Sequence, residues 1–236
     1  MSKQQRIQLA FLVKGGIPLV IYLMAGGPSD LIPNLGMYKD REGCIWVGVD
    51  RGVQILLDHG IVPAAAFGDF DSVTEDELAV IQEKLDTITI YPSEKDETDL
   101  EIAFKWAVAQ DPQEIWLFGS TGGRIDHFLG NIQLFLREEI LPLHSKISFY
   151  MADHKNLLTV KTPGSYSLQV MDDKKYISLI PVIGNADGIS LHGFKYPLQN
   201  SYLPMGSTRC ISNELILEIG NYSFTSGILL VIRSSD

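Results

Sequence analysis

The sequence predicts an α/β fold followed by a smaller all-β domain. Between residues 17 and 150, short apolar runs alternate with segments whose apolar residues recur at helical spacing. Alternating strands and helices favour a mostly parallel sheet flanked by helices, as in Rossmann-like folds. After about Met151, glycine and proline recur, helical periodicity fades and short β-like runs take over. That texture is typical of an antiparallel β-sandwich.

The individual elements follow from the same patterns. In the first part the expected strands are 19–24, 44–49, 64–67, 87–91, 114–119 and 147–150, and the expected helices are 51–59, 74–85, 98–110 and 125–139. In the second part the expected strands are 157–161, 166–170, 176–182, 189–191, 215–219 and 227–233. We therefore predict an α/β domain over 17–150 and a β-sandwich domain over 151–236, with residues 1–16 as an unplaced N-terminal lead.

Composition narrows the function classes. A net charge of −10 over 236 residues argues against a nucleic-acid or anionic-membrane partner, because both require basic patches. Local donors and a metal still suffice to bind ATP. Two cysteines cannot form a disulfide framework, which favours the cytoplasm. Lys14 and two glycines interrupt the apolar N-terminal stretch, so it cannot span a bilayer.

Paired carboxylates follow one predicted strand. Asp69 and Asp71 lie just after the apolar run 63–67, separated by one residue. If that run is a buried strand, both side chains point to the same side as the chain leaves the sheet. Carboxylates in this position suit Mg²⁺ bound to a polyphosphate, whereas the alternative is an acidic turn that caps a helix. Asp50 follows the preceding strand and is a weaker candidate of the same kind.

A second acidic stretch precedes the helix expected at 98–110. Thr98 and Glu101 form a capping box, which makes Thr98 the expected N-cap and Asp99 the first helical residue. Capping explains these residues fully, but it does not explain Lys95, since a cation before a helix N-terminus opposes the helix dipole. A phosphate between Lys95 and the helix would account for it, with Asp99 near the metal.

A glycine-rich turn opens the helix expected at 125–139. Gly122, Gly123 and Arg124 follow an apolar strand, and such a turn offers backbone N–H groups to an anion. Arg124 adds a planar fork suited to phosphate. The turn matches neither a Walker A loop nor a dinucleotide fingerprint. The alternatives are a plain turn, Asp126 as a cap and His127 as an ordinary helical histidine.

Taken together in this order, these motifs resemble the thiamine pyrophosphokinase family, also called thiamine diphosphokinases. The resemblance also covers Lys195 to Leu198 and Ile211 to Glu214, and it extends from about residue 22 to the end. It implies transfer of a diphosphoryl group from ATP to the hydroxyl of thiamine, giving thiamine diphosphate and AMP. A homodimer with the thiamine site at the subunit interface is implied as well. Arg209 and Cys210 stand where a glycine is expected before the Ile-Ser-Asn run.

The resemblance also assigns roles to residues. It implies Asp69, Asp71 and Asp99 as ligands of Mg²⁺, and Asp71, Asp99, Lys95 and Arg124 as the catalytic set. The expected ATP and phosphate contacts are Asp50, Asp69, Thr98, Gly122, Gly123, Arg124, Asp126 and His127. The expected thiamine contacts are Asp126, Asn131, Ser212 and Asn213. Either Asp71 or Asp99 could accept the hydroxyl proton, and the sequence leaves that choice open.

Two other function classes compete with this one. A metal-assisted phosphohydrolase would use the same aspartates with water as the acceptor, and it would leave the β domain without a role. A non-catalytic nucleotide or thiamine sensor would be favoured by disrupted carboxylates, but all of them are present.

Overall fold

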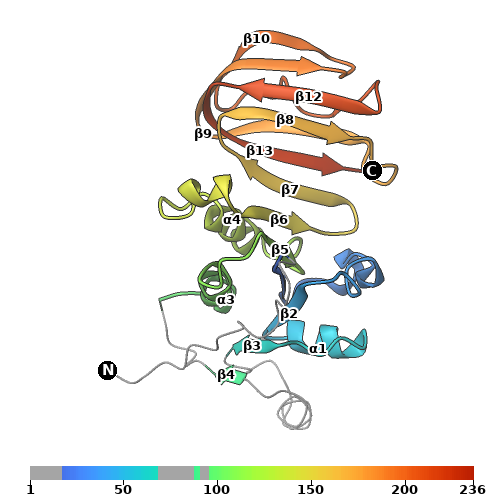
Figure 1. Ribbon diagram of the computed structural model, residues 1–236, viewed down its shortest axis with the longest axis vertical. Helices are drawn as coiled ribbons and strands as arrows, with labels where there is room; N and C mark the ends of the chain where they lie inside the picture. The colour runs from blue at the N-terminus through green and yellow to red at the C-terminus, as the bar shows by residue number, and fades with distance from the viewer. Residues whose placement is uncertain (1–17, 69–87, 91–95) are drawn as a thin grey trace. The chain divides into compact units, whose positions relative to one another are not determined.

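The computed structural model describes residues 18–68, 88–90 and 96–236 (Figure 1). They divide into two compact units. The first unit holds the described residues up to Gly26 and those within Asn34–Trp116, and the second holds Gly27–Pro33 and Leu117–Asp236. The expected lead at 1–16 and the expected helix at 74–85 lie outside the described residues. The domain boundary predicted at residue 150 stays a prediction.

Parallel strands form the sheet of the first unit, in the order β4-β3-β2-β1. Their bounds are Val20–Met24 for β1, Cys44–Val49 for β2, Ala65–Gly68 for β3 and Ile88–Ile90 for β4. All five residues of β1 are buried, as a strand covered on both faces requires. Strand β5 (Glu114–Phe118) begins in this unit, where the N–H of Gln113 donates to Leu19 O at 2.9 Å.

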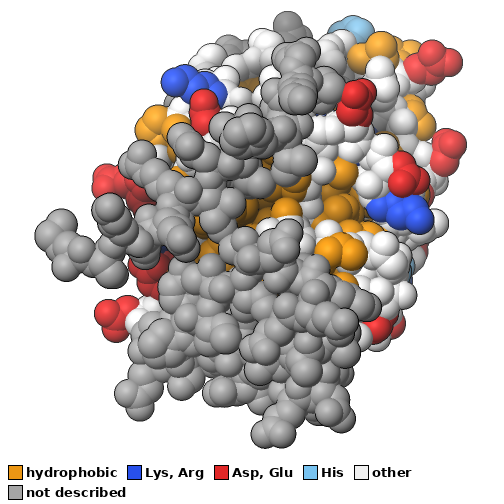
Figure 2. All heavy atoms as spheres, turned by 60° about the horizontal axis from the view of Figure 1, so that its bottom comes forward, with side chains coloured by type: hydrophobic (Ala, Val, Ile, Leu, Met, Phe, Trp, Pro, Cys, Tyr) orange, Lys and Arg blue, Asp and Glu red, His pale blue; other side chains and the backbone are white. Residues whose placement is uncertain are grey.

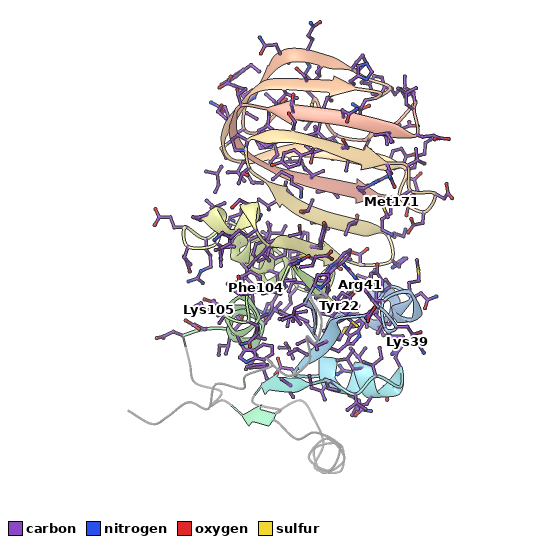
Figure 3. The ribbon with its side chains drawn as sticks, in the orientation of Figure 1. Tyr22, Lys39, Arg41, Phe104, Lys105 and Met171 are labelled. Atoms are coloured by element: carbon purple, nitrogen blue, oxygen red, sulfur yellow. The ribbon has the colours of Figure 1, made fainter. Side chains whose placement is uncertain are left out.

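Two α-helices belong to the first unit, together with the short 3-10 helix η3 (Leu35–Met37). Helix α1 spans Gly52–Asp58 and α3 spans Asp99–Val108. The apolar stripe of α3 is buried, with Leu100 7% exposed and Phe104 fully buried, while Lys105, labelled beside Phe104 in Figure 3, pairs with Glu97. The side chain of Thr98 accepts a hydrogen bond from the N–H of Glu101, so the predicted N-cap is confirmed.

An aromatic cluster fills the interior next to β1. The Tyr22 ring lies 4.6 Å from Trp46, 5.9 Å from Tyr38 and 6.4 Å from Trp116, measured between centroids. Arg41, labelled near Tyr22 in Figure 3, donates two hydrogen bonds of 2.7 Å to the Glu114 carboxylate. This pair lowers the pKa of Glu114 and ties the segment before β2 to the start of β5.

The second unit is built mainly of antiparallel strands. Its strand order is β6-β7-β13-β9-β12-β8, with β10 and β11 each paired to β9. The strands are β6 (Ser148–Ala152), β7 (Asn156–Lys161), β8 (Gly164–Gln169), β9 (Tyr176–His192), β10 (Leu198–Leu203), β11 (Asn213–Glu214), β12 (Ile219–Phe224) and β13 (Ser226–Ser234). Helix α4 (Ile125–Leu134) and the 3-10 helices η2 (Ser29–Leu31) and η4 (Leu141–Ser145) complete it.

The long strand β9 links two hydrogen-bonded layers. Its first half pairs with β13, from Tyr176 to Ile183, and its second half pairs with β12, from Ser190 to His192. Both halves contribute to one hydrophobic core, which includes Leu179 and Leu191 together with Tyr222 of β12. Because β9 belongs to both layers, residues from its two halves pack together in the core of this unit.

The predicted fold class is wrong. Strand pairs among the described residues are mostly antiparallel, and β1, β2, β3 and β4 pair in parallel. Three α-helices, α1, α3 and α4, are found in this described part, so the whole is a mixed, strand-rich structure and not a helix-flanked Rossmann-like sheet. The error has a physical reason: a short buried apolar run looks the same in a parallel and an antiparallel sheet.

Several strand boundaries in the second unit also differ from expectation. The two strands expected at 176–182 and 189–191 are one continuous strand, β9. The strand expected at 215–219 is replaced by β11 and β12, and Ile216 and Leu217 between them are 66% and 50% exposed. Strands β10 and β12 were missed because polar side chains dilute their apolar alternation.

The surface view turns a different side of the chain forward (Figure 2). Acidic side chains are spread around the margin of this face, and hydrophobic side chains show at its centre. In the described part of the chain, no helix has the length and apolar character needed to cross a membrane.

Candidate functional site

In the first unit, Asp50 lies at the carboxyl ends of the parallel strands. Its N–H donates to Phe67 O at 2.9 Å, and its φ of 50° is in the left-handed region, which Asp tolerates better than most residues. A Cβ atom placed on Gly68 would lie 2.2 Å from Asp50 Oδ1. The Asp50 carboxylate therefore lies against Gly68, the last residue of β3. Gly68 directly precedes Asp69 in the chain.

Most of the predicted metal set lies outside the described residues. Asp69, Asp71 and Lys95 belong to the segments that the structure does not describe. Within the described ranges, no group of three or more His, Cys, Asp or Glu residues is arranged to hold a metal. Asp99 is the first residue of α3, as predicted. The side chains of Asp50 and Asp99 carry carboxylate oxygens, the ligand type that Mg²⁺ prefers.

In the second unit, two loops meet at the glycine-rich turn. The N–H of Gly27 donates to Gly119 O at 2.8 Å, and a Cβ on Gly27 would lie 2.4 Å from that oxygen. A Cβ on Gly122 would lie 2.1 Å from the Leu31 side chain, and Gly122 and Gly123 both have positive φ. The segment around Gly27 therefore packs directly against the turn.

The glycine-rich turn is hydrogen-bonded to helix α4 and has buried polar side chains beside it. Asn131 donates its side-chain N–H to Ser120 O at 2.9 Å, which ties the turn to α4. Ser120 and Thr121 are each 5% exposed, and neither side-chain hydroxyl has a hydrogen-bond partner among the described residues. Asn131 was predicted to contact thiamine, and here its amide supports the turn.

Arg124 and Asp126 form an exposed ion pair at the start of α4. Arg124 Nε and Nη2 donate to the two oxygens of Asp126 at 3.1 and 2.6 Å. The guanidinium is the main cause that lowers the pKa of Asp126 to about 2, and the carboxylate raises the pKa of Arg124. Asp126 also accepts from the N–H of the exposed His127 at 3.0 Å. The structure brings these three predicted residues together at the α4 N-terminus.

Ser212 and Asn213 lie at the entry to β11. Ser212 has a φ of 56°, and its N–H donates to the buried Ser178 Oγ at 3.0 Å. Asn213 is only 4% exposed, and its side chain binds the backbone of Tyr196 and the N–H of Glu214. Glu214 accepts from Lys195 at 2.9 Å and pairs with Lys175 at 3.0 Å.

The structure adds one residue that sequence reasoning did not assign. Tyr196 is 58% exposed, and it is anchored to the loop that carries Ser212 and Asn213. The sequence feature that could have identified Tyr196 is its place in the stretch from Lys195 to Leu198, which is part of the family resemblance. An exposed aromatic ring on a fixed backbone is suited to a flat aromatic ligand.

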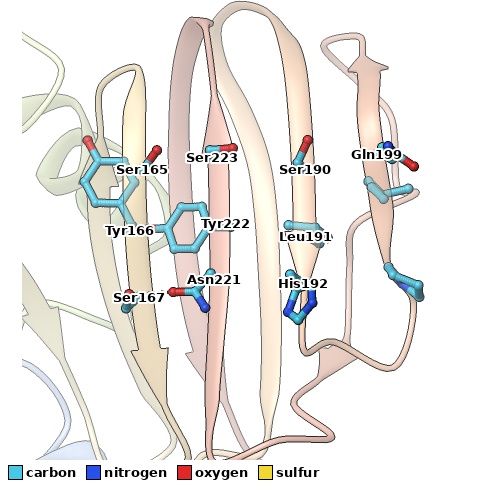
Figure 4. A pocket seen from close by; sticks show the side chains of 12 residues that line it. Ser165, Tyr166, Ser167, Ser190, Leu191, His192, Gln199, Asn221, Tyr222 and Ser223 are labelled. Atoms are coloured by element: carbon cyan, nitrogen blue, oxygen red, sulfur yellow. Dashed lines mark hydrogen bonds between the residues drawn. The ribbon is translucent and has the colours of Figure 1, made fainter.

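A groove of about 880 Å³ crosses β8, β9, β10 and β12 (Figure 4). Most of its exposed side chains are polar, among them Ser167, His192 and Asn221, and Ser167 Oγ donates to Asn221 Oδ1 at 2.7 Å. The lining includes no residue that the sequence predicted for ATP, thiamine or metal.

Two family models match the chain. Residues 41–150 match the thiamin pyrophosphokinase catalytic domain, and residues 165–229 match the thiamin pyrophosphokinase vitamin B1 binding domain. Both matches are to parts of one transferase. The chain belongs to the thiamine pyrophosphokinase family.

Individual relatives agree with that assignment. The chain is similar to the thiamine pyrophosphokinase of Bacillus subtilis, with 47% identity over 92% of this chain and 99% of the relative. The crystal structure of that enzyme matches with a TM-score of 0.85 and 46% identity, over 92% of this chain and 99% of that one. A structure from Geobacillus thermodenitrificans matches with a TM-score of 0.82 and 45% identity, over 92% and 98%. The family resemblance drawn from the motifs is confirmed.

Proposed function

We propose that the protein transfers a diphosphoryl group from ATP to the hydroxyl of thiamine, giving thiamine diphosphate and AMP. The hydroxyl oxygen attacks the β-phosphorus, the bond from that phosphorus to the oxygen bridging to the α-phosphate breaks, and AMP leaves. The hydroxyl proton passes to a carboxylate, for which Asp71 and Asp99 are the candidates. Transfers of this kind depend on positioning and charge neutralisation more than on covalent catalysis.

One observation carries the proposal. A segment matching a catalytic domain and a segment matching a vitamin B1 binding domain follow each other in one chain, which is 47% identical to a thiamine pyrophosphokinase. A hydrolase would have no use for the second segment. A sensor would not need the intact set Asp50, Asp69, Asp71 and Asp99.

The phosphate contacts are proposed from the glycine-rich turn and its flanks. Gly122, Gly123, Arg124 and His127 lie at the N-terminal end of α4, where the helix dipole favours an anion. Arg124 already makes a two-pronged contact with the Asp126 carboxylate, and a phosphate presents the same kind of paired oxygens. Thr98 and Lys95 are proposed as further phosphate contacts beside α3.

We propose Asp69, Asp71 and Asp99 as the residues that hold Mg²⁺, with Asp50 beside them at the end of β2. Of these four residues, the structure describes Asp50 and Asp99, and both supply carboxylate oxygens. Asp69 directly follows Gly68 in the chain, and Gly68 packs on Asp50. When bound, Mg²⁺ supplies positive charge that neutralises the phosphate oxygens of ATP.

On the thiamine side, Asp126 and Ser212 are proposed as polar contacts, and Tyr196 is added as an aromatic one. The homodimer is a proposal as well. Large apolar side chains are exposed between positions 211 and 219, including Ile211, Ile216 and Ile219 at 45, 66 and 48%, and a subunit contact would cover such a patch. Both cysteines are free thiols, which supports a cytoplasmic location.

The test is a reaction of the purified protein with ATP, Mg²⁺ and thiamine, followed by phosphorus NMR and chromatography. AMP and thiamine diphosphate that form only when thiamine is present would establish the reaction. Release of phosphate or diphosphate without thiamine would instead favour the hydrolase. Calorimetric binding of thiamine without turnover would favour the sensor.

A further inference from the structure

We propose that Asn213 is a positioning residue for the thiamine site and not a thiamine ligand. Its buried amide holds the backbone of Tyr196, so that the exposed Tyr196 ring is presented to the substrate. This inference rests on the proposed function, and it replaces the direct thiamine contact that the sequence predicted for Asn213.

The hydrogen bonds of Asn213 are used within the protein. Its Oδ1 accepts from the N–H of Tyr196 at 3.0 Å and from the N–H of Glu214 at 2.9 Å, and its Nδ2 donates to Tyr196 O at 2.9 Å. The side chain thus satisfies both backbone polar groups of Tyr196, as a neighbouring strand would. With a residue exposure of 4%, the amide is buried beneath the loop and faces no solvent that a ligand could replace.

The backbone around Ser212 sets the direction of the Asn213 side chain. Ser212 adopts a left-handed φ of 56°, and the buried Ser178 holds its N–H at 3.0 Å. This turn brings Asn213 into β11, where it pairs with Ile177. The Asn amide carries a donor and an acceptor on one planar group, and its short side chain fits a backbone pair next to its own strand.

A second set of bonds holds the residue before Tyr196. The N–H of Lys195 donates to Glu214 O at 2.8 Å, and its ammonium donates to the Glu214 carboxylate at 2.9 Å. Residues 195 and 196 are therefore held to residues 213 and 214 by both backbone and side-chain hydrogen bonds. The Tyr196 ring lies outside these hydrogen bonds: it is 58% exposed, and the Lys195 ammonium lies 5.6 Å from its centroid.

This arrangement suits a ligand with a flat aromatic ring. An exposed tyrosine loses binding energy if its backbone must be ordered when the ligand arrives, and a fixed backbone removes that cost. Thiamine carries two aromatic rings, an aminopyrimidine and a thiazolium. Asn213 then contributes to thiamine affinity through Tyr196, with no atom of its own on the substrate.

The experiment is a double-mutant cycle on the full-length protein with Asn213→Ala, Tyr196→Ala and the double variant. Steady-state kcat and KM are measured for thiamine at saturating ATP, and for ATP at saturating thiamine. Asn221→Ala is the matched control, since Asn221 is an exposed asparagine of the same unit outside the proposed site. Thermal melting is recorded for every variant.

We expect each single variant to raise the KM for thiamine up to about tenfold, the scale of one lost aromatic contact, with the KM for ATP unchanged. The double variant should be no worse than Tyr196→Ala, because Asn213 acts only through that ring. A double variant in which the two losses multiply would show a direct contact by Asn213 and overturn the inference. An unchanged thiamine KM in either single variant would also overturn it.

If Asn213→Ala fails to fold, Asn213→Asp serves in its place. It keeps the acceptor for Tyr196 N–H and removes the donor to Tyr196 O, and the same non-additivity with Tyr196→Ala is expected. Failure of the proposed function is distinguishable, because the unmodified protein would then form no thiamine diphosphate. Normal turnover with multiplying losses would reject only the positioning role.

Discussion

Arg124 and Asp126 contact each other through two hydrogen bonds, at 3.1 and 2.6 Å, on the exposed first turn of α4. Exposed pairs of this kind contribute little to folding. The pKa of Asp126 is held at about 2, and the pair is therefore ionised throughout the physiological range.

The first prediction concerns Arg124→Lys, which keeps the charge and loses the planar fork. We expect the KM for ATP to rise roughly tenfold, since a two-pronged contact becomes a single one, while the melting temperature stays unchanged. Arg137→Lys is the matched control, because Arg137 also pairs with a carboxylate two residues later, Glu139, at 2.6 Å. An equal rise in both variants would argue against a phosphate contact by Arg124.

The second prediction concerns Asp71→Asn. Loss of one carboxylate charge should lower kcat by at least about a hundredfold, because metal-bound charge stabilises the transferred group by several kcal/mol. Melting curves should be close to those of the unmodified protein. Rates measured across a Mg²⁺ titration test this, with Asp58→Asn at the end of α1 as the control. Unchanged turnover would remove Asp71 from the metal role.

The third prediction concerns the close approach of Gly27 to Gly119. Gly27→Ala would place a methyl group 2.4 Å from Gly119 O, so the loop must move, at a cost of about 1–3 kcal/mol. In contrast, Gly130→Ala on α4 meets no atom within 4 Å and should stabilise the helix by about 0.5–1 kcal/mol. Urea denaturation of the two variants should therefore show opposite shifts, and shifts of the same sign would contradict the packing described.

The fourth prediction concerns pH and His144. Burial lowers the pKa of His144, whose ring lies tilted against Phe149 with 4.9 Å between centroids and donates from Nε2 to Phe135 O at 2.9 Å. The folded state therefore takes up its proton at lower pH than the unfolded state, whose histidine titrates near pH 6.5. Stability is fully present above that value and falls as the pH drops below it.

Melting temperatures between pH 7.5 and 5 test this relationship. The unmodified protein should lose more stability over that range than His144→Gln, which retains a side-chain donor and has no charge to gain. Parallel losses in the two proteins would assign the acid sensitivity to other groups.

Local features of the fold were readable from the sequence because they depend on neighbours in the chain. The capping box predicted Thr98 as the N-cap of α3, and the apolar run from Cys44 to Val49 predicted β2 with the same bounds as the structure. The ordered motifs also indicated the family, since each needs only short-range spacing.

Pairing direction depends on contacts that spacing does not encode, which is why the mostly parallel, helix-flanked fold was mispredicted. The same limit applies to the site. The sequence by itself determined which residue types are present at the strand ends, at the α4 turn and around Ser212, because chemistry follows residue identity and order. Only the tertiary structure decided that Asn213 is buried against the Tyr196 backbone and that Gly27 packs on Gly119, because these relationships join segments that local pattern cannot connect.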